Sequence, residues 1–404
     1  MKQRRRAGWG KPSGASQPDS LGSELAAEPV SESHHSPREC PLLWPSTLDS
    51  GLSPLDTLPL MFSPIFSVVM PAYNAERYVG EAIESVLAQT MPSWELLVVD
   101  DCSTDRTLEV CRSYRDSRIR VFSSPQNLNA AGARNLALEH AQGEFIALLD
   151  SDDWMAPNRL ERQWEFFQQH PQVGVCGSYV ETFETLQSSA NRGTIEYPCG
   201  NGTIKATMFF YDPFVTSSVS LRMILTLKSG IPVFKSNYAV AEDYDLWARL
   251  IDQTDFANLP EFLTRYRVHG SQLTQTHSAP MRRQVARVFE LLFEKIGIEE
   301  TQARLALHEA LIYEKERPMH KLFEIKSWLE MLWSAGLNAG FLPNEEWNKT
   351  IGFWWFVACQ RAWPRSLKCW RTYRSSPLAK YFFSRRQKLE FLKDCFCGIF
   401  GSKA

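Results

Sequence analysis

Carboxylates gather at one point of the chain in a pattern suited to binding a metal ion. Asp150, Asp152 and Asp153 directly follow an apolar run, residues 145–149. Adjacent carboxylates repel one another unless a cation lies among them, and Mg²⁺ or Mn²⁺ accepts such oxygen ligands together with substrate phosphates. Asp150 and Asp152 therefore suggest a metal ion that holds a diphosphate. The alternative is that these acids cap a helix that begins near Pro157.

A second acidic group follows another apolar run. Asp100 and Asp101 end the run, and Ser103 and Asp105 come next. A carboxylate at this place can accept the N3–H of a uracil or a ribose hydroxyl, whereas Ser103 or Asp105 can instead cap the following helix. Arg134 lies between the two acidic groups, where it can tether Asp100 or Asp101, contact a phosphate, or simply lie on the surface.

The elements that must position these residues alternate between strand and helix. This alternation predicts an α/β fold with a mostly parallel central sheet, in which the carboxyl ends of the strands bring both acidic groups to one edge. A second, more mixed half is expected to follow. We predict strands over 65–70, 96–99, 119–122, 144–149, 173–178 and 213–222, and helices over 78–87 (capped by Asn74), 130–140, 157–169 and 242–251.

The ends of the chain differ from this pattern. Residues 1–62 are rich in Ser, Pro, Gly and Glu and predict a disordered leader, and Met61 is a possible true start. Residues 278–404 predict a helical C-terminal region without strands, with helices over 280–297, 300–316, 320–335, 345–362 and 378–393.

Composition excludes several classes of protein. A net charge of -2 over 404 residues argues against binding of nucleic acid through a basic surface. Nine cysteines in no metal-binding spacing indicate reduced thiols and a cytoplasmic protein. The chain has no run of the ~20 apolar residues that a membrane-spanning helix needs. Pro71-Ala72-Tyr73-Asn74 stands where a dinucleotide-dependent oxidoreductase would carry glycines.

Taken in order, these motifs carry a family resemblance over about residues 65–275. The chain resembles the inverting family 2 glycosyltransferases, which have the GT-A fold, a Rossmann-like α/β architecture. The motifs are Phe66-Ser-Val-Val-Met-Pro71-Ala-Tyr73-Asn74, Ser85-Val-Leu-Ala-Gln89-Thr90, Val99-Asp-Asp101-Cys-Ser103-Thr-Asp105, Gly132-Ala-Arg134-Asn135 and Leu149-Asp150-Ser-Asp152-Asp153. The resemblance implies a GT-A domain over 63–277. One departure is Asn129, where the family often has Gly; Asn tolerates the left-handed backbone.

The resemblance also implies roles for individual residues. Pro71, Ala72 and Tyr73, with Asp100 or Asp101, would hold the base and ribose of a nucleotide-sugar. Arg134 would line the pocket. Asp150 and Asp152 would be the family's DxD pair, which bridges the ribose and a Mn²⁺ or Mg²⁺ ion bound to the diphosphate.

The second half resembles the family's catalytic segment. Asp243, at the start of a predicted helix, would be the base that deprotonates the acceptor hydroxyl, and the helix N-terminus favours its charged form. Glu242 would position the acceptor, although Glu242 and Asp245 also remain candidates for the base. His269 would contact the metal or diphosphate, and Arg267 would neutralise the leaving phosphate.

The C-terminal region has an unusual charge distribution. Residues 361–388 contain nine Lys or Arg and no Asp or Glu, which suits peripheral contact with an anionic membrane through 361–404, on its inner face. The alternative is a helical bundle with an aromatic core. The aromatic residues concerned are Trp363, Trp370, Tyr373, Tyr381, Phe382 and Phe383.

The sequence therefore predicts a cytoplasmic, metal-dependent glycosyltransferase. It would move a sugar from a nucleotide-sugar donor, expected to be a UDP-sugar, to a hydroxyl of a glycan or lipid-linked acceptor in cell-surface polysaccharide synthesis. The alternative is a nucleotide-sugar-binding regulator or scaffold without catalysis, which the complete set of acidic positions disfavours.

Overall fold

A parallel half-sheet forms the first part of the molecule. The computed structural model describes residues 64–184, 193–230, 232–238, 240–269, 278–299, 301–363, 366–381, 388–393 and 395. Strands β1 to β4 pair in parallel in the order β3-β2-β1-β4, with α1, α2 and α3 between them. The bounds are β1 Phe66–Ala72, α1 Val79–Leu87, β2 Trp94–Asp100, α2 Thr107–Ser113, β3 Ile119–Ser123, α3 Asn129–Leu138 and β4 Phe145–Leu148.

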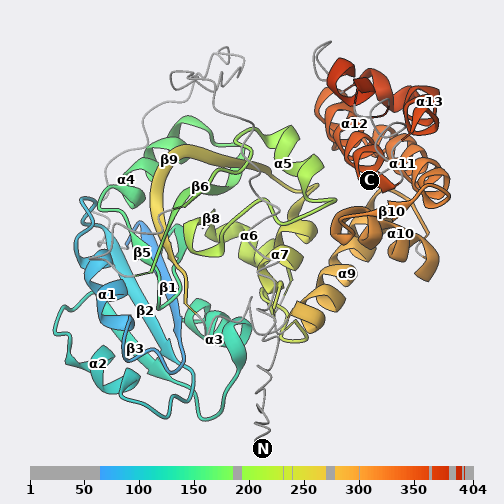
Figure 1. The fold of residues 1–404 in the computed structure, drawn as a ribbon. Helices are drawn as coiled ribbons and strands as arrows, with labels where there is room; N and C mark the ends of the chain where they lie inside the picture. The colour runs from blue at the N-terminus through green and yellow to red at the C-terminus, as the bar shows by residue number, and fades with distance from the viewer. Residues whose placement is uncertain are drawn as a thin grey trace, which may run out of the picture.

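A mixed half extends the same sheet. The order continues β4-β8-β6-β9-β5, with β7 paired to β6; β6 and β9 are parallel and the other pairs antiparallel. The long strand β9 crosses the middle of Figure 1. The bounds are β5 Trp154–Met155, α4 Arg159–Gln169, β6 Val173–Phe183, β7 Thr194–Ile195, α5 Asn201–Thr207, the 3₁₀ helix η1 Thr216–Ser218, β8 Ser220–Arg222, α6 Met223–Lys228, α7 Glu242–Leu250 and β9 Asp255–Arg267.

Strands β1, β2 and β4 are largely apolar because helices cover both faces of the sheet. Val69 and Leu97 belong to the core on one face, which includes α3 and α7, and Val68 and Leu96 belong to the core on the other, which includes α1 and α4. All four side chains are fully buried. This explains why strands in this half could be predicted from continuous apolar runs.

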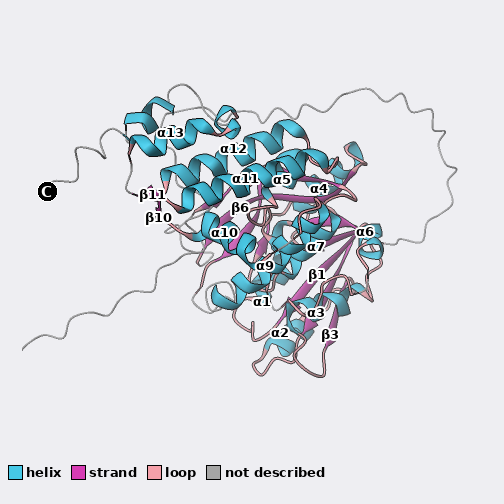
Figure 2. Cartoon of the chain, turned by 90° about the vertical axis from the view of Figure 1, so that its right-hand side faces the viewer, coloured by secondary structure: helices cyan, strands magenta, loops and turns pink. Residues whose placement is uncertain are grey.

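Helices form the C-terminal region, as predicted. Figures 1 and 2 show α11, α12 and α13 together at the end of the molecule farthest from β3. The bounds are α9 Ser278–Lys295, α10 Gln302–Tyr313, α11 Lys321–Asn338, α12 Asn344–Gln360, α13 Leu367–Ser375 and η2 Pro377–Lys380. The region is not free of strands, because a two-residue parallel pair, β10 Arg317–Pro318 with β11 Ala362–Trp363, joins the loops around α11 and α12.

Several predicted elements are wrong or incomplete. Asn74 does not cap α1; it adopts a left-handed φ of 49°, and its Oδ1 accepts the Thr104 N–H at 2.9 Å. The strand predicted over 213–222 is short, since η1 occupies its middle. The predicted leader, 1–62, lies outside the described residues.

Candidate functional site

The carboxyl ends of β1 and β2 form one wall of the site. Ala72 pairs with Asp100 in the sheet register, and the Ala72 carbonyl accepts the Asp101 N–H at 2.8 Å. Pro71 precedes Ala72 in β1, and the side chain of Tyr73, just beyond the strand, is 52% exposed. These residues lie together at the strand ends, as predicted.

The two neighbouring aspartates have different surroundings. Asp101 Oδ1 accepts the Ser124 hydroxyl at 2.9 Å and the Leu128 N–H at 2.7 Å, so Asp101 anchors the loop before α3. Asp100 is 2% exposed, and its buried Oδ1 has no hydrogen-bond partner among the described residues. An unpaired buried oxygen is costly, so Asp100 is the better placed of the two to accept a ligand hydrogen bond.

The loop after β2 also resolves the capping alternative. Asp105 Oδ1 accepts the Thr107 N–H at 2.9 Å at the start of α2, whereas Ser103 Oγ accepts the Asn74 N–H at 3.0 Å. Asn129 adopts a φ of 60°, which explains why a residue that tolerates the left-handed region is needed there.

Arg134 joins the two halves of the site. Its Nη2 lies 2.6 Å from Asp150 Oδ1, and its Nη1 donates to Glu242 Oε1. Arg134 is 3% exposed; burial lowers its pKa, but Asp150 and Glu242 raise it further, so the net shift is upward. The predicted tether to Asp100 or Asp101 is therefore wrong. Arg134 instead links Asp150 to Glu242 of α7, a residue 108 positions after Arg134 in the sequence.

The pKa values of the two carboxylates that contact Arg134, Asp150 and Glu242, are raised despite this contact. Burial raises the pKa of Glu242, against the lowering effect of Arg134. Burial likewise raises the pKa of Asp150, which Arg134 lowers and Asp152 raises. One guanidinium therefore serves two carboxylates, and the site retains excess negative charge that a cationic ligand would relieve.

Asp152 and His269 come together across the sheet edge. His269 Nε2 lies 2.9 Å from Asp152 Oδ2, and the His269 ring lies against Tyr78 at 5.1 Å between centroids. Asp152 and His269 are 117 positions apart in the sequence. Among the residues that the structure describes, no group of three or more His, Cys, Asp or Glu side chains is arranged to hold a metal ion.

Asp153 and Arg267 hold the segment 150–153 in place through hydrogen bonds. Asp153 Oδ1 accepts the Arg267 N–H at 2.9 Å, and Arg267 Nε donates to the Asp152 carbonyl at 2.8 Å. Arg267 is 2% exposed, and its Nη2 donates to Glu81. The structure therefore places Arg267 as a buried support for the loop, with its guanidinium engaged by protein groups. The acids 150–153 do not cap α4, whose N-cap, Asn158, makes no side-chain capping bond.

Asp243 lies at the start of α7, near Arg134 and Asp150. Its Oδ1 accepts the Tyr244 N–H at 2.7 Å, and its Oδ2 accepts the Thr216 hydroxyl. Ala241, at the N-cap of α7, has a left-handed φ of 68°, an uncommon conformation for a residue with a side chain. Asp245 instead faces Arg249 at 2.7 Å and Lys235 at 3.6 Å and is fully buried, which makes it structural rather than a candidate base.

Three supporting residues escaped the sequence analysis. Thr216 orients Asp243, and Ser217 Oγ accepts the Asp150 N–H at 3.1 Å. Arg159, which is fully buried, donates to the carbonyls of Leu148 and Val219 at 3.1 Å each and also to that of Ser217. A Ser, a Thr and an Arg in these contexts give no sequence signal, because their roles depend on how η1 folds against β4.

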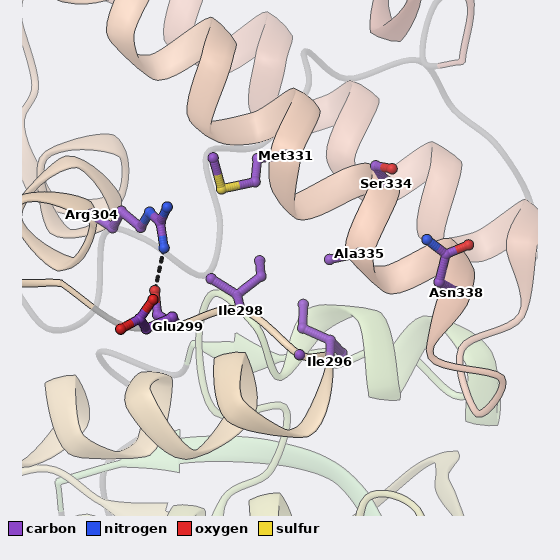
Figure 3. A pocket seen from close by; sticks show the side chains of 9 residues that line it. Ile296, Ile298, Glu299, Arg304, Met331, Ser334, Ala335 and Asn338 are labelled. Atoms are coloured by element: carbon purple, nitrogen blue, oxygen red, sulfur yellow. Dashed lines mark hydrogen bonds between the residues drawn. The ribbon is translucent and has the colours of Figure 1, made fainter.

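A separate hollow of about 570 Å³ lies between the end of α9 and α11. Figure 3 shows Ile296, Ile298 and Met331 around it, with an Arg304–Glu299 hydrogen bond at one side. None of the predicted site residues lines it. The candidate site is therefore the strand edge described above.

Comparisons with known proteins identify the family of the chain. The model of the family described as "Glycosyl transferase family 2" matches residues 67–223. The Escherichia coli protein named UDP-Glc:alpha-D-GlcNAc-diphosphoundecaprenol beta-1,3-glucosyltransferase WfgD is 30% identical over 250 residues, which cover 58% of this chain and 94% of that protein. The putative glycosyltransferase EpsE of Bacillus subtilis (strain 168) is 34% identical over 193 residues, 47% of this chain and 68% of EpsE.

Solved structures also resemble the chain. The structure of S. aureus TarS 1-349 in complex with UDP-GlcNAc matches with a TM-score of 0.48 and 20% identity, covering 80% of this chain and 91% of that one. The identity to WfgD extends over nearly all of that protein, and the parallel half-sheet carries the family's motifs in order. The chain belongs to glycosyl transferase family 2 and is a glycosyltransferase with a GT-A fold and a helical C-terminal region.

Proposed function

We propose that this glycosyltransferase is metal-dependent and inverting, and that it transfers a sugar from a UDP-sugar to a hydroxyl of a glycan or lipid-linked acceptor in cell-surface polysaccharide synthesis. The observation that carries the proposal is the Arg134 bridge, which brings Asp150 of the DxD segment and Glu242, next to Asp243, to one guanidinium. The name of WfgD, which specifies UDP-Glc and a diphosphoundecaprenol-linked GlcNAc, supports the donor and acceptor classes.

The residues present fit a divalent cation. Asp152 and His269 offer the oxygen and nitrogen ligands that a divalent cation accepts, and Asp152 Oδ2 and His269 Nε2 already lie 2.9 Å apart. Asp152 and His269 would hold Mn²⁺ or Mg²⁺, and diphosphate oxygens would complete the shell. When bound, the ion would stabilise the negative charge of the leaving diphosphate.

The chain's own residues supply the remaining steps. Asp100 would accept a hydrogen bond from the uracil or ribose, while Pro71, Ala72 and Tyr73 border the nucleotide. Asp243, oriented by Thr216 and the Tyr244 N–H, would take the proton of the acceptor hydroxyl as that oxygen attacks the anomeric carbon. Attack from the face opposite the diphosphate inverts the configuration, so no second nucleophile is needed.

We also propose that residues 361–404 of the helical region contact an anionic membrane surface on the cytoplasmic side. Lys368, Arg371 and Arg374 are exposed at three-residue spacing on α13, which places them along one side of the helix. Tyr373 is 1% exposed and packs against Phe391, so this aromatic residue belongs to the core. The proposed membrane contact therefore rests on Lys368, Arg371 and Arg374, and not on Tyr373.

Two further observations bear on location. None of the helices in the described parts of the chain is long and apolar enough to span a bilayer. Cys111 and Cys176, both buried, are free thiols, as in a reducing compartment. Flotation with phosphatidylserine vesicles tests the membrane contact: the triple variant K368Q/R371Q/R374Q should lose binding at low salt, and unchanged binding would refute it.

Binding calorimetry on the full chain tests the donor and metal assignments. UDP, dTDP and GDP are titrated with and without Mn²⁺. We expect UDP to bind in a Mn²⁺-dependent manner, Asp152→Ala to abolish the dependence, and Asp116→Ala, in a partly exposed pair with Arg118, to leave it unchanged. Equal UDP binding with and without Mn²⁺ would refute the metal assignment, and preference for dTDP or GDP would refute the donor assignment.

A further inference from the structure

Two tyrosines and a carboxylate, Tyr197, Tyr211 and Asp212, lie near the candidate base Asp243. Tyr197 follows β7 and Tyr211 follows α5, and their ring centroids lie 6.3 Å apart at an interplanar angle of 31°. Tyr211 is 38% exposed, yet burial by surrounding atoms raises the pKa of its hydroxyl. Part of the Tyr211 side chain is therefore open to solvent, where a ligand can reach it.

Asp212 connects this pair to Asp243. Its Oδ1 accepts the Phe214 N–H at 3.0 Å, which turns the chain toward Thr216, the residue that donates to Asp243. Burial raises the pKa of Asp212 well above its usual range, and the negative charge of Asp243 raises it further, so the two carboxylates are close. Among the described residues, no Lys, Arg or His forms an ion pair with Asp212.

None of these three residues has a role in donor binding or in supporting the DxD segment. Aromatic faces combined with a few polar groups are typical of pockets for small organic ligands. A sugar ring offers C–H groups to an aromatic face and hydroxyls to a carboxylate. An anionic group is disfavoured here, because burial already favours the neutral form of Asp212 and the Asp243 carboxylate beside it would repel a further negative charge.

We propose that Tyr197, Tyr211 and Asp212 form the acceptor subsite, which binds an uncharged sugar ring and directs one of its hydroxyls toward Asp243. This inference rests on the proposed transferase function and names the chemistry that its acceptor must have. The tyrosine rings hold the C–H face of the sugar, and Asp212 accepts a hydroxyl adjacent to the one that reacts. Any charged portion of the acceptor, such as a lipid-linked diphosphate, then lies outside this subsite.

The test measures binding of four uncharged probes, the octyl α-glycosides of glucose, galactose, mannose and GlcNAc, to the full chain in the presence of UDP and Mg²⁺. Saturation-transfer NMR reports the sugar, and calorimetry reports UDP for each variant. We expect wild-type protein to bind at least one glycoside, Tyr211→Ala and Asp212→Asn to weaken it at least tenfold, and Tyr211→Phe to retain it. The matched control is Phe323→Ala, which removes an exposed aromatic residue on α11.

The outcomes separate this inference from the function on which it rests. Unchanged UDP affinity in all variants, with glycoside binding lost only in Tyr211→Ala and Asp212→Asn, supports the subsite. The subsite is wrong if wild-type protein binds UDP but no glycoside, or if Tyr211→Ala binds the glycoside as wild type does. Failure of wild-type protein to bind UDP would remove the proposed donor, and the subsite with it.

Discussion

At the scale of single residues, charge balance decides the architecture of the site. Arg134 is the only guanidinium that contacts both Asp150 and Glu242 among the described residues, and all three lie in largely buried surroundings. A buried carboxylate that loses its cation is strongly destabilising. Arg134 therefore contributes to folding as well as to the shape of the site.

Replacement of Arg134 by Gln should lower the free energy of unfolding by about 3 kcal/mol, because the buried Glu242 and the partly exposed Asp150 lose their cation. Urea denaturation at pH 7 measures the change. The control is Arg118→Gln, which breaks a partly exposed pair with Asp116 and should cost at most about 1 kcal/mol. An equal loss of unfolding free energy in the two variants would show that the Arg134 bridge stabilises the fold no more than the pair of Arg118 with Asp116 does.

The sequence indicated which acids matter but not how they pair. Motif order makes Asp150, Asp152 and Asp243 the predicted functional acids. The partners of Arg134 could not be predicted, because Glu242 lies 108 positions away in the sequence and only the fold brings the two together. Asp100 and Asp101 were equivalent in sequence, and only the Ser124 and Leu128 hydrogen bonds to Asp101 distinguish them.

At the scale of elements, helix α4 joins the two halves of the site. Arg159 holds the carbonyls at the ends of β4, η1 and β8, and Gln163, one turn later, donates to the carbonyls of Cys176 and Ser218 at 2.9 Å. Burial lowers the pKa of Arg159 to about 9, which still leaves it protonated at neutral pH. This pair positions both Asp150, through Ser217, and Asp243, through Thr216.

Arg159→Met should therefore destabilise the fold by about 2–4 kcal/mol, since several buried carbonyls lose a charged donor. It should also weaken UDP binding, because the Ser217 contact to Asp150 loses its support. Arg162→Met is the control on the same helix, where the partly exposed pair with Glu261 is worth at most about 1 kcal/mol. Wild-type stability and UDP affinity in Arg159→Met would contradict this role.

Element prediction succeeded where the apolar pattern was continuous and failed where it was broken. Strands β1, β2 and β4 are buried on both faces and were predicted nearly to their ends. Strand β9 was not predicted, because its burial alternates irregularly and Pro260 interrupts it. The two-residue strands β5, β7, β10 and β11 are too short for any periodic signal.

At the scale of the whole molecule, a buried histidine fastens the helical region to the sheet region. His308 of α10 is fully buried; its Nε2 lies 2.7 Å from the Phe209 carbonyl, just after α5, and its Nδ1 accepts the Trp328 indole N–H at 3.2 Å. These contacts fix the neutral ring, with the proton on Nε2. Burial lowers the pKa of His308 to about 3, because the cation has no water around it.

The low pKa of His308 predicts that the fold loses stability as the pH falls. The unfolded chain binds a proton at His308 below about pH 6.5, whereas the folded chain does not until about pH 3, so stability falls as pH drops through this window. The contribution is at most about 1.4 kcal/mol per pH unit. Urea unfolding of His308→Gln from pH 7 to pH 4.5 should show a correspondingly shallower decline than wild type. Identical slopes would contradict the prediction.

The rate of sugar transfer by Asp243→Asn tests the central claim most directly. UDP-glucose serves as the first donor, with a lipid-linked α-GlcNAc diphosphate as acceptor, and UDP affinity is measured alongside. The loss of the base should reduce kcat by about 10²–10⁴-fold while UDP affinity stays unchanged, and Asp245→Asn marks the effect of a purely structural neighbour. Turnover by Asp243→Asn near the wild-type rate would contradict the assignment of Asp243 as the base.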